Sequence, residues 1–140
     1  MRAISKLRST LFTFRLPNLS PSMQCGRVLR LHVKEGDLLP AYGLFADVET
    51  QELTEGSRKS VQLEIELQDE LHVAKLFTPP SSCEVPVGTL LALLTEDIED
   101  IPHIRTIQSD DLQLLDNKAV QQVLWQAYVK NAHDANQCGL

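Results

Sequence analysis

The chain has 140 residues, of which 43% are hydrophobic and 5% aromatic, which suffices for one ordinary domain with an aliphatic core. Its longest apolar runs, such as residues 90–94, are far too short to span a membrane. Cys25, Cys83 and Cys138 form no close pair in the sequence, which argues against a disulfide framework and favours a reducing compartment.

Charge is distributed unevenly along the chain. Residues 1–34 hold seven of the 13 basic residues and no acid, whereas the 19 acids all lie from Glu35 onward. A body with this acidic balance argues against nucleic acid as the main partner, because phosphate binding requires a basic surface.

The first 13 residues are basic, rich in hydroxyl groups and free of acids. A short helix there would place Ile4, Leu7 and Leu11 on one side, which is typical of a mitochondrial targeting segment. The alternative is an ordinary basic N-terminus. The targeting interpretation predicts a mitochondrial protein, in the matrix or on the matrix side of the inner membrane.

Residues 14–101 consist of short apolar stretches separated by glycine and proline. Residues 34–37 and 41–44 have the composition of turns. Residues 61–67 alternate strictly between apolar and polar side chains, as expected for a strand with one buried face. Many short strands with frequent turns predict an all-β sandwich or barrel.

The same region repeats itself with a shift of 45 residues. Residues 26–50 then fall on residues 71–95 without a gap, and Val28 coincides with Val73 and Gly43 with Gly88. Two equivalent halves related by a pseudo-two-fold axis would explain this match. The connection between the halves, residues 51–60, would lie at one end of the sandwich.

The tail after Pro102 has a different pattern. Near-helical spacing of its apolar residues, with Asp110 and Asp111 in the first turn, predicts an amphipathic helix over residues 110–132. Its apolar face packs either on the chain's own domain or on another protein, and we favour a partner. The candidate interaction residues are Leu112, Leu115, Val123, Leu124, Trp125 and Tyr128.

Residues 14–101 resemble the lipoyl domains of dihydrolipoyl acyltransferases, the core enzymes of 2-oxoacid dehydrogenase complexes. The resemblance is carried in order by LPNLSPSM at 16–23, KEGD at 34–37, DVET at 47–50, LEIE at 63–66 and VPVGT at 85–89. It implies a flattened barrel of two four-stranded antiparallel sheets with pseudo-two-fold symmetry. With the tail, this predicts an all-β lipoyl/biotinyl-type sandwich followed by a C-terminal α-helix.

In the family that it resembles, an Asp-Lys-Ala tripeptide follows Glu-Thr at the tip of a tight hairpin, and lipoate acylates the lysine. The long arm then carries acyl groups and electrons between active sites. Here the position of that lysine falls on Glu52 when counted from Glu49-Thr50, and on Ser60 when counted back from residues 63–66. About eight extra residues separate the two anchors. The lysine within this insertion is Lys59, either a displaced attachment site or part of a solvated basic pair with Arg58.

Other chemistry-bearing residues show no pattern of a site. The four histidines, His32, His72, His103 and His133, have no carboxylate or cysteine at ligand spacing, so no metal site is predicted. No nucleophilic triad, phosphate-binding loop or catalytic carboxylate pair is present in the sequence, and we predict that the chain is not an enzyme. We expect no cofactor, with lipoate on Lys59 as the alternative.

Three functions are compatible with these features. The first is a non-catalytic structural or interaction subunit of a large mitochondrial assembly (a respiratory complex, the ribosome or a dehydrogenase complex), with other protein subunits as partners. The second is a lipoyl carrier of a 2-oxoacid dehydrogenase complex that uses Lys59. The third is an adaptor that binds dehydrogenase components without carrying an acyl group.

Overall fold

A computed structural model describes residue 7 and residues 9–19, 23–54, 57–77, 84–108 and 120–129, with side chains at all of these except 52–54 and 57–59. The described segments form ten strands. These are β1 (Leu11–Arg15), β2 (Cys25–Leu31), β3 (Leu38–Leu39), β4 (Gly43–Thr54), β5 (Ser57–Leu67), β6 (Leu71–Leu76), β7 (Val85–Pro86), β8 (Leu90–Thr95), β9 (Val120–Gln122) and β10 (Trp125–Val129).

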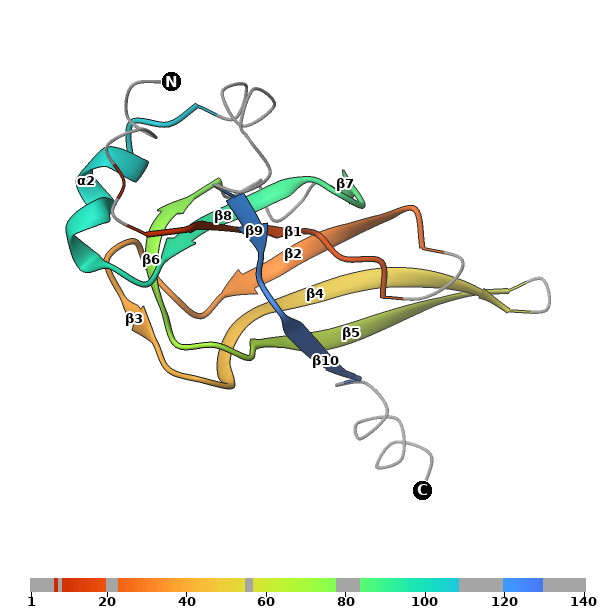
Figure 1. Cartoon of the computed structure of the whole chain (residues 1–140). Helices are drawn as coiled ribbons and strands as arrows, with labels where there is room; N and C mark the ends of the chain where they lie inside the picture. The colour runs from red at the N-terminus through yellow and green to blue at the C-terminus, as the bar shows by residue number, and fades with distance from the viewer. Residues whose placement is uncertain are drawn as a thin grey trace.

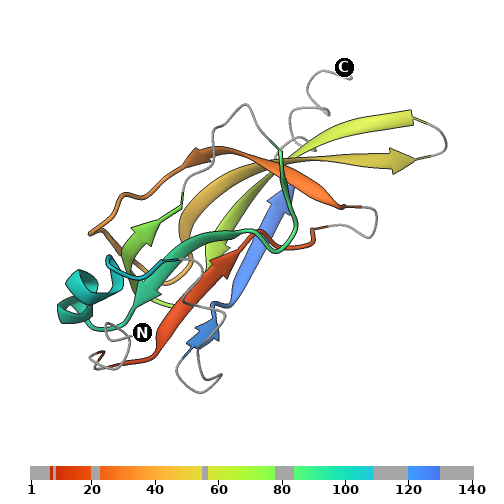
Figure 2. The ribbon, with the colours of Figure 1, turned by 90° about the horizontal axis from the view of Figure 1, so that it is seen from above.

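The strands form two five-stranded sheets that pack face to face (Figures 1 and 2). One sheet has the order β3-β6-β8-β1-β9 and the other the order β10-β5-β4-β2-β7. Neighbouring strands are antiparallel except β1 and β9, which are parallel. The predicted all-β sandwich is confirmed, with a fifth strand added to each expected four-stranded sheet.

The two halves of the sandwich are equivalent, as the sequence repeat predicts. Each strand from β1 to β4 has its equivalent four strands later, from β5 to β8. When equivalent strands are exchanged, the order β3-β6-β8-β1 becomes β7-β2-β4-β5, which is the order of the other sheet without β10. A register shift occurs between Val28 and Arg30 in β2 and between Val73 and Lys75 in β6, again 45 residues apart. The pseudo-two-fold axis therefore relates even the irregularities of the sheets.

The core between the sheets is mainly aliphatic. Its one close aromatic pair among the described residues is Phe14 and Phe45, with ring centroids 4.8 Å apart. In β5, Leu63, Ile65 and Leu67 are buried while the polar residues between them are not. The alternation predicted from the sequence thus places one face of β5 against the core.

The predicted helix over 110–132 is wrong in the part that the structure describes. Residues 120–129 form β9 and β10, and Leu112 and Leu115 lie outside the described residues. Val123, Trp125 and Ala127 fit the period of two of a strand as well as a helical pattern, and all three pack on the core. The edges of β1 and β5 supply backbone hydrogen-bond partners for this segment. Pairing with these edges favours the strand over the helix.

We call residues 120–129 the C-terminal strap, because they cross from one sheet to the other. β9 pairs with β1, and the Val123 N–H donates to the Thr13 carbonyl oxygen at 3.0 Å. The Gln68 N–H then donates to the Leu124 carbonyl oxygen at 2.9 Å, and β10 pairs with β5. The strap therefore joins the edges of both sheets along one side of the sandwich (Figure 1).

The residues after β8 are fixed to the body rather than extended away from it. Residues Ile98–Asp100 form a 3-10 turn, and α2 (Ile101–Ile104) follows with a proline in its first turn. Ile101, Ile104 and Ile107 are buried in a second apolar cluster. No helix in the described segments has the length and apolar character needed to cross a membrane.

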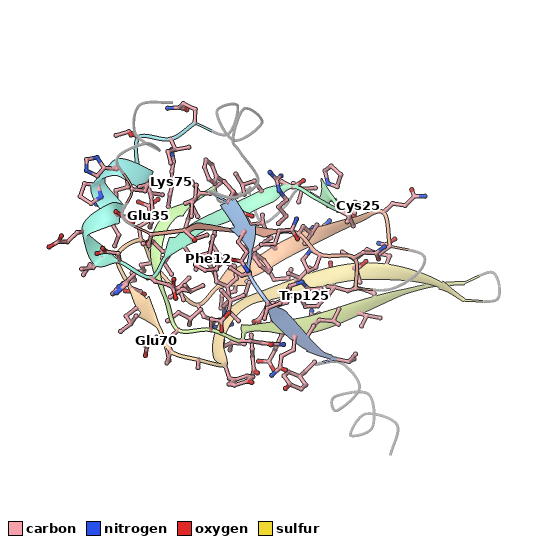
Figure 3. The ribbon with its side chains drawn as sticks, in the orientation of Figure 1. Phe12, Cys25, Glu35, Glu70, Lys75 and Trp125 are labelled. Carbon is pink, nitrogen blue, oxygen red and sulfur yellow. The ribbon has the colours of Figure 1, made fainter. Side chains whose placement is uncertain are left out.

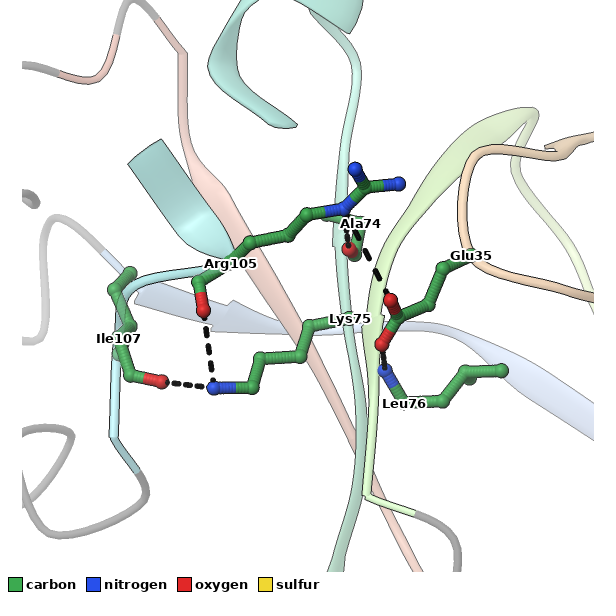
Figure 4. A network of polar contacts seen from close by, with 6 residues as sticks. All are labelled: Glu35, Ala74, Lys75, Leu76, Arg105 and Ile107. Carbon is green, nitrogen blue, oxygen red and sulfur yellow. Dashed lines mark hydrogen bonds and ion pairs between the residues drawn. The ribbon is translucent and has the colours of Figure 1, made fainter. Parts of the chain in front are cut away.

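A polar network secures this segment against β6 (Figure 4). The Lys75 Nζ donates to the carbonyl oxygens of Arg105 and Ile107 at 3.2 and 2.6 Å. Glu35 accepts from the Leu76 N–H at 2.9 Å and lies 3.9 Å from the Arg105 guanidinium. The network satisfies carbonyl groups of the residues that follow α2 and so holds this segment against β6.

The sandwich begins earlier than residue 14, the boundary predicted from the sequence. β1 starts at Leu11, which is fully buried, and Leu7 packs against the second apolar cluster. The Ser9 N–H and hydroxyl both donate to the Asp100 carboxylate at 3.0 Å. Removing residues 1–13 as a targeting segment would therefore remove part of the fold.

The strap gives a direct test of its contribution to stability. Val123 is 5% exposed, whereas the adjacent Leu124 is 59% exposed. We expect Val123→Ser to lower the free energy of unfolding by about 2 kcal/mol, because it removes buried methyl groups and buries a hydroxyl. Leu124→Ser is the matched control and should change it by less than about 0.5 kcal/mol. Equal effects in chemical denaturation would contradict the packing of the strap.

Candidate functional site

The β4–β5 hairpin is the element in which the sequence predicts the site. Its two strands pair from Gly43 opposite Leu67 to Thr54 opposite Ser57, with one register shift between Leu44 and Ala46. The strands are 12 and 11 residues long, the longest in the described part of the chain. The hairpin therefore projects beyond the rest of the sandwich (Figures 1 and 2).

The inner part of the hairpin is fixed by polar contacts to β2 and to His32, the residue that follows β2. The His32 Nε2 lies 3.1 Å from the Asp47 carboxylate, and the Arg27 guanidinium lies 3.4 Å from the Glu49 carboxylate. The hydroxyl of Thr50, a buried residue, donates to the Cys25 carbonyl oxygen at 3.3 Å. The segment up to Thr50 thus belongs to the rigid body of the domain.

The ten residues 51–60 form an extension of the hairpin beyond this body. Thr50 lies opposite Val61, and four further residue pairs continue the ladder to Thr54 and Ser57. The extra residues inferred from the sequence are therefore divided equally between the two strands. At about 3.4 Å per residue they move the turn outward by about 14 Å.

We call residues 51–54 and 57–60 the outer ribbon. β10 pairs with residues 63–67 of β5, and β2 pairs with residues 46–49 of β4. Neither strand extends along the outer ribbon. Among the described residues, the outer ribbon is therefore a two-stranded ladder with no third strand.

The structure places Lys59 within a strand of this ribbon. Its backbone lies opposite Glu52 in the third residue pair from the end of the ladder, and the two pairs beyond it are Leu53 with Arg58 and Thr54 with Ser57. Glu52 and Ser60, the two positions at which counting places the attachment lysine, are likewise strand residues rather than turn residues. The arrangement differs from a lysine presented by a tight turn directly after Glu-Thr.

The predicted interaction residues of the tail separate into two groups. Val123 and Trp125 pack on the chain's own core, and Trp125 lies along β10 beside the sandwich (Figure 3). Leu124 and Tyr128 are 59% and 51% exposed, and the Tyr128 hydroxyl lies 2.8 Å from the Gln126 amide. The expectation that the whole set docks on a partner is therefore wrong for Val123 and Trp125.

The described residues offer no alternative reactive centre. No cluster of three or more histidine, cysteine or acidic side chains in the described segments could hold a metal ion. The Cys25 thiol lies at the hairpin end of β2 and donates to the Glu84 carboxylate at 3.2 Å (Figure 3). Cys83, Cys138 and His133 lie outside the described residues.

Sequence reasoning missed two features near the hairpin. It did not find the His32–Asp47 pair. The available signal was weak: His32 directly follows β2, and Asp47 lies on β4, which pairs with β2. It also did not find β10, which pairs with residues 63–67 of β5. The period-two spacing of Val123, Trp125 and Ala127 was the available signal for β10.

The chain is similar in sequence to dihydrolipoyllysine-residue acetyltransferase components of pyruvate dehydrogenase complexes. It is 38% identical to that of Rickettsia prowazekii over 85 residues, which are 61% of this chain and 19% of the relative. It is 32% identical to the mitochondrial component of Caenorhabditis elegans over 95 residues (68% and 17%), and 29% identical to that of Saccharomyces cerevisiae over 96 residues (69% and 18%).

The chain thus spans about a fifth of the length of the curated relatives it matches. No protein-family model matches it. The matched part of each relative has the size of a single domain of that longer protein. The fold of this chain is the two-sheet sandwich that the resemblance implies. The chain therefore contains a lipoyl-type domain, homologous to part of the dihydrolipoyllysine-residue acetyltransferases of pyruvate dehydrogenase complexes.

Proposed function

We propose that this chain is an adaptor of a mitochondrial 2-oxoacid dehydrogenase complex, which binds subunits of the complex without carrying lipoate itself. The single observation that carries the proposal is the extension of the β4–β5 hairpin in a domain otherwise of the lipoyl type. The relatives are components of pyruvate dehydrogenase complexes, which favours a dehydrogenase complex over a respiratory complex or the ribosome.

The residues of the hairpin do not fit a lipoyl arm. Attachment requires a lysine that projects from a rigid turn, because the modifying enzyme must reach its amine and recognise both flanks. Lys59 lies within a strand, where its backbone pairs with that of Glu52, and not at a turn. We infer that the chain neither accepts lipoate nor transfers acyl groups.

A mitochondrial location is supported by two observations. The basic, acid-free N-terminal stretch has the composition of a targeting segment. The relatives from worm and yeast are mitochondrial components. Since Leu11 and Phe12 are buried in the sandwich, we propose that any removed segment ends before Leu7.

Shortening the hairpin tests why lipoate is excluded. A variant in which residues 51–60 are replaced by Asp-Lys joins Thr50 to Val61 through a tight turn and presents the lysine at its tip. Co-expressed with a lipoate-attaching enzyme, this variant should gain one lipoyl group by intact-mass measurement, whereas the unaltered chain should gain none. Replacement by Asp-Arg is the control and should also gain none.

Two outcomes would contradict this account. A lipoyl group on the unaltered chain that is lost in Lys59→Arg would establish the carrier function, the second candidate. A folded, shortened variant that stays unmodified would show that the body of the domain, rather than the hairpin, excludes the enzyme.

Affinity capture from mitochondria tests the proposed assembly. The full chain, used as bait and followed by mass spectrometry, should enrich dehydrogenase-complex subunits over ribosomal and respiratory-chain proteins. A purified pyruvate dehydrogenase complex should then bind the chain directly, with a Kd of about 10 μM or lower, as is usual for a specific but modest interface. Enrichment of ribosomal or membrane-complex subunits alone would contradict the adaptor and favour a structural role elsewhere.

A further inference from the structure

The turn before β4 holds a tyrosine in a backbone conformation that side chains disfavour. Residues 40–43 form this turn, in which the Gly43 N–H donates to the Pro40 carbonyl oxygen at 2.8 Å. Tyr42, the third residue of the turn, has a φ of 61° and is the one non-glycine residue with positive φ in the described part of the chain. A bulky side chain crowds the backbone there, so the turn by itself favours glycine.

The other half of the sandwich contains the same turn with glycine at this position. Residues 86–89 form it, and their third residue, Gly88, has a φ of 96°. The Gly88 N–H donates to the Leu16 carbonyl oxygen, directly after β1, at 2.9 Å. The Tyr42 N–H donates to the Leu67 carbonyl oxygen, at the end of β5, at 2.8 Å. Because β1 and β5 are equivalent strands, Tyr42 occupies the place that glycine has in the other half.

The fold gains little from the side chain of Tyr42. That side chain is 58% exposed and belongs to neither apolar cluster of the described residues. Glycine at this position would make the same backbone hydrogen bond without the crowding. A strained residue that contributes so little to packing indicates a role outside the fold, and tyrosine is among the residues that dominate binding energy at interfaces.

Tyr42 lies beside the turn that joins β5 to β6. The sheets pair Leu39 with Leu71 on one side of this place and Gly43 with Leu67 on the other. The residues between these pairs in the two segments therefore lie side by side. They are at the end of the sandwich away from the outer ribbon (Figure 1).

This end of the sandwich carries negative charge next to Tyr42. Asp69 and Glu70 belong to the turn between β5 and β6, and both are exposed. Residues 35–57 and 60–74, which include both segments, contain no lysine or arginine. We call Tyr42, Asp69 and Glu70 the acidic corner. An exposed aromatic ring with carboxylates beside it is complementary to a cationic side chain, because the ring face and the carboxylates both attract positive charge.

We propose that the acidic corner binds a basic segment of a partner protein, with an arginine or lysine side chain seated on the Tyr42 ring. The charge of the corner selects this occupant, because Asp69 and Glu70 repel an acidic segment. The identity of the partner as a dehydrogenase-complex subunit rests on the proposed function.

Substitutions of Tyr42 separate binding from folding. Tyr42→Gly relieves the crowding of the turn and should raise the melting temperature by about 2 °C. The same substitution removes the ring, so the Kd for a purified pyruvate dehydrogenase complex should rise about tenfold. Tyr42→Phe keeps the ring and should leave the Kd within about twofold. The proposal is overturned if Tyr42→Gly binds as well as the unaltered chain, or if it melts at a lower temperature.

Charge reversal tests the carboxylates. Glu70→Arg should raise the Kd for the same complex about tenfold, because it opposes the basic segment. Glu84→Arg is the matched control, since Glu84 is also an exposed acid but contacts Cys25, which lies at the other end of the sandwich from Glu70 (Figure 3). It should change the Kd less than about twofold. Equal effects of the two reversals would show attraction by overall charge and would overturn the site.

Photo-crosslinking identifies what the corner touches. With p-benzoylphenylalanine in place of Tyr42, the chain should crosslink to a peptide of the complex that carries lysine or arginine at or beside the crosslinked residue. A crosslink to an acidic or uncharged stretch would contradict the proposed occupant. The same group in place of Tyr128, another exposed tyrosine, is the control and should not capture that peptide.

The outcomes distinguish this inference from the proposed function. If the unaltered chain binds the complex and the substitutions of Tyr42 and Glu70 leave the Kd unchanged, the adaptor stands and the acidic corner is not its binding site. If the unaltered chain does not bind the complex at all, the adaptor fails, and the partner inferred for the acidic corner fails with it.

Discussion

The antiparallel ladder between β4 and β5 determines what this domain can present at its tip. The ladder joins the two pseudosymmetric halves and is anchored inside the body by Thr50, which lies opposite Val61. Because the inserted residues lengthen both strands equally, the inner register and the buried positions of β5 are unaffected. The turn alone is displaced. The chain thus keeps the sandwich of a lipoyl-type domain while its hairpin changes from a lysine-presenting turn into a projecting ribbon.

The same pseudosymmetry explains the path of the C-terminal strap. The strands β1 and β5 are equivalent under the two-fold relation and would each form the edge of a four-stranded sheet. The two-fold relation makes β1 and β5 run in opposite directions. The strap passes β1 and then β5 while it runs in one direction, so β9 is parallel to β1 and β10 is antiparallel to β5. Val123, between the two strands, fills the side of the core. The strap therefore converts two exposed edges into paired ones.

The sequence predicts the body of the fold well, because its signals are local. Alternation over residues 61–67, the turn residues and the 45-residue repeat each follow from positions close in the chain, and the structure agrees with all three. The helix prediction is wrong for residues 120–129, because Val123 and Trp125 suit a helix or a strand equally, and only the distant edges of β1 and β5 decide between them. The insertion was located correctly, but its division between two strands depends on cross-strand register, which the sequence does not encode locally.

The position of the remaining strand edges connects the fold to the adaptor proposal. Among the described strands, each sheet ends on one side at a strand of only two residues, β3 or β7, and on the other side at a strand of the strap, β9 or β10. The hairpin is the element that the insertion changes, because residues 51–60 continue the β4–β5 ladder by four residue pairs beyond Thr50 and Val61. The insertion displaces the turn and leaves the pairing of the inner strands and the buried positions of β5 unchanged. A domain that keeps its body but not the turn that would present a lysine is what the proposed adaptor without a lipoyl arm requires.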